Sequence, residues 1–150
     1  MVMRKMPKAI KGFLELTHSR QQIEIIEYIT NKMLDTNELV DLRARVVNSY
    51  LLHRNERSIY HSLETLAKKK EILRVRFVDR SKKESEIDYH YYIGLIDYAK
   101  IVENFRKKYP FIPLEERLIN QFEELQNTVK SIFASSKILK LAKEYYENEE

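Results

Sequence analysis

The spacing of apolar residues changes from helical to alternating near residue 72 and returns to helical near residue 97. Helical stripes come first, two alternating runs follow, and further helical stripes complete the chain. This order predicts a mainly α-helical protein with a small antiparallel β-hairpin, an α+β fold.

The first two helices are predicted on either side of residue 36. Ser19 can cap a helix that runs to about residue 34, because Gln22 stands three residues on, as a capping box requires. A second helix is expected to begin near Glu38. Their apolar faces are Ile25, Ile26, Ile29 and Met33, and then Leu39, Leu42, Val46 and Val47. The end of the second helix stays open.

A third helix is expected over about residues 55–69, with Asn55 as its cap. Its buried stripe would be Ile59, Leu63, Leu66 and Ala67. It ends in three lysines, whose charges suit the negative end of a helix dipole.

The alternating runs cover residues 73–78 and 87–93, and a charged, polar stretch joins them. Such runs predict an antiparallel hairpin spanning about residues 72–93. Arg74 and Arg76 fall on the strand face that carries Asp88 and His90, so cross-strand pairs are expected as an alternative to ligand contacts.

The C-terminal third is expected to hold a helix over 97–108 and a longer one over 114–146, separated by Pro110 and Pro113. The longer one carries a heptad seam, which favours pairing with a second copy of the chain. The alternative is pairing within the chain, with the first helix or with residues 8–16. The predicted dimer interface is Leu118, Phe122, Leu125, Val129, Ile132 and Leu139.

These elements suggest three regions. Residues 1–18 would form a basic N-terminal extension, residues 19–97 the main domain, and residues 98–150 a helical dimerisation region. No apolar stretch is long enough to span a bilayer, and no signal peptide is expected.

Composition excludes several function classes. The chain has no cysteine, which removes disulfides and thiolate metal sites and favours a cytoplasmic setting, or a nucleoid or nuclear one. Its two glycines cannot form a glycine-rich phosphate loop. The net charge of +4 is concentrated, because residues 54–83 hold ten Lys or Arg against four Asp or Glu. A basic segment of this kind suits a polyanion, with a solvated ionic surface as the alternative.

The segment from Ser58 to Leu73, with its Ser-Ile-Tyr start and Leu-x-x-Leu core, resembles the recognition helix and first wing strand of winged helix-turn-helix regulators of the PadR and MarR groups. Asp88–Leu95 resembles the tyrosine-rich second wing strand of PadR-like proteins. Two departures stand out: Lys70 or Glu71 takes the place of the usual glycine, and the stretch before the third helix is long.

The resemblance implies a winged-helix protein that binds double-stranded DNA as a homodimer through a long C-terminal helix. The third helix would enter the major groove, and the hairpin would contact the flanking backbone or minor groove. The expected DNA-binding residues are Arg54, Asn55, Arg57, Ser58, Tyr60, His61, Ser62, Arg74, Arg76, Arg80, Lys82 and Lys83. For Tyr60, packing is an equal alternative.

No catalysis, cofactor or metal is expected. No nucleophile, base and orienting group are expected in one place, and the four histidines lie on different predicted elements without metal-site spacing. The leading hypothesis is a sequence-specific transcriptional regulator. The alternatives are a winged-helix docking module of transcription or replication machinery and an architectural or partition protein with little sequence preference. The DNA site, the direction of regulation and any effector stay open.

Overall fold

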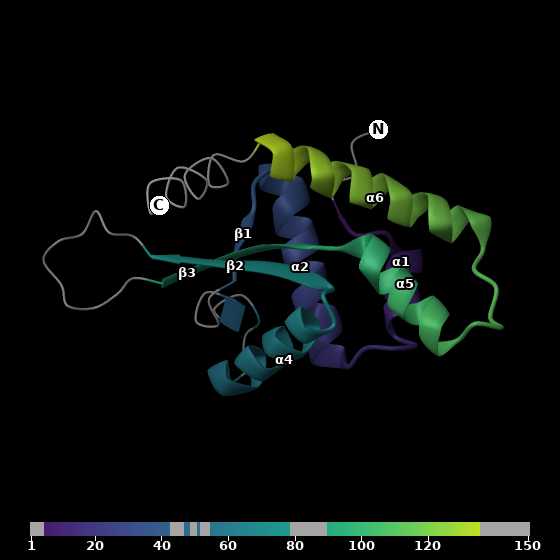
Figure 1. Ribbon diagram of the computed structural model, residues 1–150, viewed down its shortest axis with the longest axis horizontal. Helices are drawn as coiled ribbons and strands as arrows, with labels where there is room; N and C mark the ends of the chain where they lie inside the picture. The colour runs from purple at the N-terminus through teal and green to yellow at the C-terminus, as the bar shows by residue number, and fades with distance from the viewer. Residues whose placement is uncertain (1–4, 43–46, 49–50, 52–54, 79–89, 136–150) are drawn as a thin grey trace, which may run out of the picture.

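The computed structural model describes residues 5–42, 47–48, 51, 55–78 and 90–135. Over these residues the protein is mainly α-helical, with a small sheet that packs mainly against the helices over residues 20–36 and 56–68 (Figure 1). The predicted segments 79–86 and 136–146, and residues 43–46, lie outside this description. None of the described helices is long and apolar enough to cross a membrane.

Helix α1 (Lys8–Leu14) is short and follows Pro7, whose carbonyl accepts hydrogen bonds from the backbone of Ile10 and Lys11. Ile10, Phe13 and Leu14 fall at i, i+3 and i+4 and are buried in the main core. The segment predicted as a basic extension therefore contributes a helix to the core.

Helix α2 (Arg20–Thr36) forms the centre of the molecule (Figure 1). Its predicted capping box is confirmed: the Ser19 hydroxyl accepts from the Gln22 backbone, and the Gln22 side chain accepts from the Ser19 backbone. The helix ends at Asn37, which adopts the left-handed conformation with φ 54°. That conformation turns the chain away from the helix axis.

The predicted second helix does not begin at Glu38. Residues Val40–Asp41 instead form strand β1, which pairs antiparallel with β3. Val40 and Leu42 are both buried, whereas Leu39 is only half-buried. Leu39 and Leu42 fit the spacing of a helix, whereas Val40 and Leu42 fit the alternation of a strand. Pairing with the distant strand β3 decides for the strand.

Helix α4 (Glu56–Lys68) begins as predicted, with the Asn55 side chain accepting from the Arg57 backbone at 2.8 Å.

Strands β2 (Ile72–Val78) and β3 (His90–Ile96) pair antiparallel, and the sheet order is β1-β3-β2. The register sets Arg74 opposite Gly94 and Arg76 opposite Tyr92. Val78 stands opposite His90, so Arg76 and His90 are diagonal neighbours on one face of the sheet, as expected, and Asp88 lies outside the described residues.

Helices α5 (Tyr98–Lys108) and α6 (Glu116–Ser135) complete the described chain, with α6 lying along one side of the molecule (Figure 1). Asp97 caps α5 through the Lys100 backbone. The Gln126 side chain of α6 also accepts from the backbone of Tyr98 and Ala99, at 2.9 and 3.3 Å. These bonds fix the beginning of α5 against α6.

The seam on α6 is buried within a single chain. Phe122, Leu125, Val129 and Ile132 are each at most 4% exposed and belong to the core cluster that also contains α1. Phe13 of α1 lies 5.1 Å from the Phe122 ring and 4.7 Å from the Phe105 ring of α5. The seam is covered by α1, which lies in the segment 8–16 named in the alternative prediction, and also by α5, which neither prediction named. Leu118 is half-buried at its margin, and Leu139 lies outside the description.

Helix α4 ends in a turn that usually contains glycine. The Glu71 backbone donates to the Leu66 carbonyl and the Lys70 backbone to the Ala67 carbonyl, the two bonds of a Schellman motif. Lys70 takes the left-handed position, with φ 61°. Winged-helix regulators usually have a glycine after the recognition helix. In this chain Lys70 takes that place and adopts the left-handed conformation that glycine favours.

We expect Lys70→Gly to raise the free energy of unfolding by about 1 kcal/mol, because a side chain in the left-handed region costs roughly that much. Urea unfolding followed by circular dichroism measures it. Lys69→Gly is the matched control, since Lys69 has ordinary helical angles and glycine gains nothing there. Equal responses of the two variants, or a loss of stability in Lys70→Gly, would contradict the role given to this turn.

Candidate nucleic-acid interface

Helix α4 is fixed on the molecule by one face and leaves the other open. Ile59, Leu63 and Leu66 are at most 1% exposed and form the buried stripe that the sequence predicts. Gln21 of α2 also holds α4 in place: its Oε1 accepts hydrogen bonds from the Ser58 and Ser62 hydroxyls at 3.0 and 2.6 Å. The helix is thus held by α2 through apolar and polar contacts together.

The predicted DNA-binding residues on α4 divide into two groups. Asn55 caps the helix and the two serines bond Gln21, so these three side chains hold or orient α4. Arg57 and His61 are exposed, and Tyr60 is 48% exposed, which favours the contact role over the packing one. Within the described part of the chain, the Arg57 guanidinium and the His61 ring form no hydrogen bond or ion pair.

The remaining predicted contacts are only partly described. Arg74 and Arg76 lie in β2 by backbone position, and their side chains fall outside the description. Arg54, Arg80, Lys82 and Lys83 fall outside the described residues altogether. The structure thus brings together Arg57, Tyr60 and His61 as one exposed group on the N-terminal half of α4.

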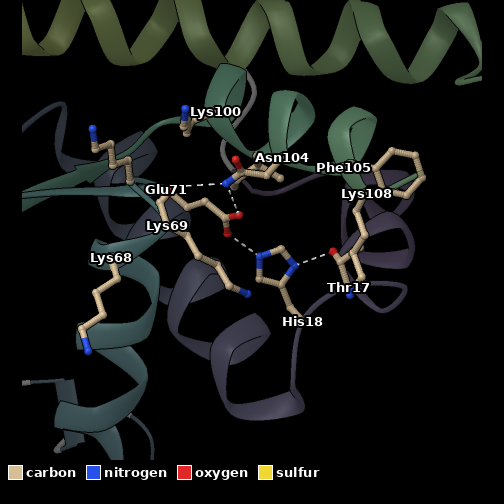
Figure 2. A pocket seen from close by; sticks show the side chains of 11 residues that line it. Thr17, His18, Lys68, Lys69, Glu71, Lys100, Asn104, Phe105 and Lys108 are labelled. Carbon is tan, nitrogen blue, oxygen red and sulfur yellow. Dashed lines mark hydrogen bonds and ion pairs between the residues drawn. The ribbon is translucent and has the colours of Figure 1, made fainter. Parts of the chain in front are cut away.

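The C-terminal end of α4 is held by a buried polar cluster that sequence reasoning missed (Figure 2). A Glu71 carboxylate oxygen lies 2.5 Å from His18 Nε2, and the other accepts from Asn104 Nδ2 at 2.9 Å. The His18 and Glu71 side chains are each 3% exposed. The Glu71 carbonyl also accepts from the Asp97 backbone at 2.8 Å, so one residue ties α4 to the α1–α2 turn and to α5.

The ionisation of Glu71 follows from these contacts. Burial acts to raise its pKa, but the hydrogen bonds from His18 and Asn104 and the positive charges of His18 and Lys69 outweigh burial and lower the pKa below its ordinary value. The charged carboxylate is therefore the form that the folded protein stabilises. No sequence spacing could have revealed the cluster, because its members come from three separate elements.

The same cluster contradicts one sequence expectation. The Thr17 hydroxyl lies 2.7 Å from His18 Nδ1, so a hydroxyl, an imidazole and a carboxylate do meet in one place. Both ring nitrogens are already engaged, and the ring is buried. These hydrogen bonds link the α1–α2 turn to the residue that follows α4.

A second buried polar contact fixes α5 on α2. The Tyr98 and Thr30 hydroxyls are hydrogen-bonded to each other, and both side chains are fully buried. Burial raises the pKa of the Tyr98 phenol far above its ordinary range, with the Thr30 hydrogen bond a smaller opposing effect. Within the described parts of the chain, no group of three or more His, Asp or Glu residues could hold a metal ion.

Comparison of the chain with protein-family models, with curated proteins and with solved structures finds no match.

Proposed function

We propose that this protein is a winged-helix protein that binds double-stranded DNA, with α4 in the major groove and the β2–β3 strands beside the backbone. The observation that carries the proposal is the exposed group Arg57, Tyr60 and His61 on a helix whose opposite face is fixed. A helix of this kind fits the major groove, which is about 12 Å wide. The paired strands after α4 supply the element from which a wing would extend.

The side chains on the exposed face have the chemistry for base contacts. Arginine can bind both acceptors of guanine, and a fixed backbone makes such bidentate contacts selective. Histidine can donate to or accept from a base edge. Gln21 holds α4 in place, and a rigid recognition element loses less entropy on binding. We therefore favour a sequence-specific regulator over an architectural protein.

A homodimer is part of the proposal, because helix-turn-helix readers commonly bind two half-sites about one turn of DNA apart. Its interface has to use surfaces other than the buried seam of α6. Light scattering is expected to give twice the mass of one chain. A monomeric mass would contradict binding to two half-sites and would leave one recognition helix per DNA site.

The proposal is tested with the double variant Arg57→Ala/His61→Ala. A preferred duplex is first obtained by selection in vitro, and binding is then compared with a random duplex. We expect the variant to bind the preferred duplex at least about tenfold more weakly, because each good base contact contributes about 1–3 kcal/mol, and to discriminate less. Arg106→Ala, which removes an exposed arginine from α5, is the control and should retain discrimination.

One observation favours the alternative of a protein-docking module. Phe111 is 96% exposed and Ile112 is 50% exposed, between Pro110 and Pro113 in the α5–α6 connection. Exposed apolar side chains on a proline-restrained loop suit a protein contact. Under the DNA proposal, Phe111→Ala leaves DNA affinity unchanged.

A further inference from the structure

A cavity of about 450 Å³ opens beside the His18–Glu71–Asn104 cluster, between the end of α4, α5 and the α1–α2 turn (Figure 2). This volume falls within the range of small-molecule sites. Five lysines line it: Lys68, Lys69 and Lys70 from the end of α4, and Lys100 and Lys108 from α5. Glu71 is the one carboxylate among its lining residues, so the lysines of the lining outnumber its carboxylates by four.

The negative charge at the cavity is already compensated. Both Glu71 carboxylate oxygens have partners, His18 and Asn104, and Lys69 adds a favourable charge. Lys68, Lys69 and Lys70 form no ion pair with any residue that the structure describes. Lys100 pairs with Glu103 at 3.3 Å, but both groups are partly exposed, and such a pair is weak. Lys68 and Lys70 are therefore available to a ligand, and the contacts of Lys100 with Glu103 and of Lys108 Nζ with the Tyr109 ring, 5.5 Å to its centroid, are weak enough to be exchanged for one.

The helix dipole explains only part of this arrangement. Lysines at the C-terminal end of α4 are favoured by its dipole, but Lys100 lies in the first turn of α5, at the positive end of that dipole. Lys70 occupies a backbone conformation that glycine adopts more easily. Two of the five lysines thus occupy positions that cost stability in the free protein, which points to a use in a bound state.

We propose that this basic cavity binds a small phosphate-bearing anion. Five ammonium groups around one cavity match the charge and the multiple acceptor oxygens of a phosphate or pyrophosphate group. The site is at the opposite end of α4 from Arg57 and His61 and uses other residues, so the inference stands whether or not the proposed DNA function holds. Because the anion contacts α4, α5 and the α1–α2 turn together, its binding stabilises the fold.

The probe is pyrophosphate, titrated into the full chain by calorimetry at constant ionic strength, with chloride as the reference salt. We expect saturable binding and a melting temperature about 3–6 °C higher at ten times the dissociation constant. Lys69→Gln/Lys108→Gln should weaken binding roughly tenfold or more, since two charge-assisted contacts are lost. Lys107→Gln, one position outside the cavity on the same helix, is the matched control.

Lys70→Gly separates ligand binding from folding. This variant should be more stable than the natural chain without pyrophosphate and should nevertheless bind pyrophosphate more weakly, a combination that misfolding cannot produce. The source of the phosphate is tested by adding duplex DNA: competition with pyrophosphate assigns the site to the DNA backbone, and independent binding assigns it to a free metabolite-sized anion. The proposal would be overturned if pyrophosphate showed no saturable binding, or if Lys107→Gln lost as much affinity for pyrophosphate as Lys69→Gln/Lys108→Gln.

Discussion

Replacing Glu71 by alanine is expected to lower the free energy of unfolding by about 3 kcal/mol, because it removes one partner of a buried, hydrogen-bonded pair. The change leaves His18 Nε2 without a partner in a site where the side chain is 3% exposed. It also deprives Asn104 of one of its two acceptors, leaving the Lys69 carbonyl. Thermal unfolding should shift downward by roughly 6–12 °C.

The control is Glu103→Ala. Glu103 contacts Lys100 and Lys107 on the surface of α5, and the hydrogen bond from Lys107, followed by that from Lys100, lowers its pKa. Water screens these charges, so the variant should unfold like the natural chain. If both glutamate variants behave alike, the buried cluster does not hold α4 in place.

The Glu71 cluster also predicts a pH dependence. The pKa of the folded carboxyl lies below its ordinary value of 4.5, so its contribution to stability is present above that value and is lost as the pH falls through the lowered folded pKa. The stability difference between the natural chain and Glu71→Ala should therefore shrink below about pH 4.5. Urea unfolding between pH 3 and 7 measures it. A difference that grows on acidification would contradict the assigned direction.

The second large effect is expected for Phe122→Ala, which should lower the free energy of unfolding by about 3–5 kcal/mol through loss of buried surface and a residual cavity. Phe122 is 3% exposed, and its ring lies 5.1 Å from the Phe13 ring and 6.3 Å from the Tyr98 ring. Because these partners belong to the same chain, the loss should be independent of protein concentration and leave the native mass unchanged.

Leu118→Ala is the companion variant, since Leu118 lies on the same seam but is only half-buried. Leu118→Ala should lower the free energy of unfolding clearly less than Phe122→Ala does. A melting temperature that rises with protein concentration in the natural chain, and no longer does so in Phe122→Ala, would instead show that the seam joins two copies.

Local sequence signals predicted the helices well where the residues themselves decide the structure. The Ser19–Gln22 capping box, the Asn55 cap and the buried face of α4 all depend on neighbours within a few residues, and all are present. Strand β1 was missed because its pairing partner, β3, lies far along the chain. Leu39 and Leu42 fit a helix, whereas Val40 and Leu42 fit a strand, and the sequence alone does not decide between them.

The candidate site was predictable only in part, for the same reason. The exposure of Arg57 and His61 follows from the helical period of α4 once its apolar stripe is recognised. The commitment of Ser58 and Ser62 to Gln21 could not be foreseen, since it depends on how α4 crosses α2. The two hydrogen bonds of the His18–Glu71–Asn104 cluster join residues that are 53 and 33 positions apart, a juxtaposition that only the tertiary fold creates.

The measurement that tests the central proposal most directly is the affinity of the natural chain for duplex DNA, by fluorescence anisotropy over a series of salt concentrations. We expect the preferred duplex to bind about a thousandfold more tightly than a random one, with affinity that falls steeply as salt rises. Equal, salt-sensitive binding of both duplexes would favour the architectural alternative. No binding to either duplex at low salt would contradict the DNA-binding account.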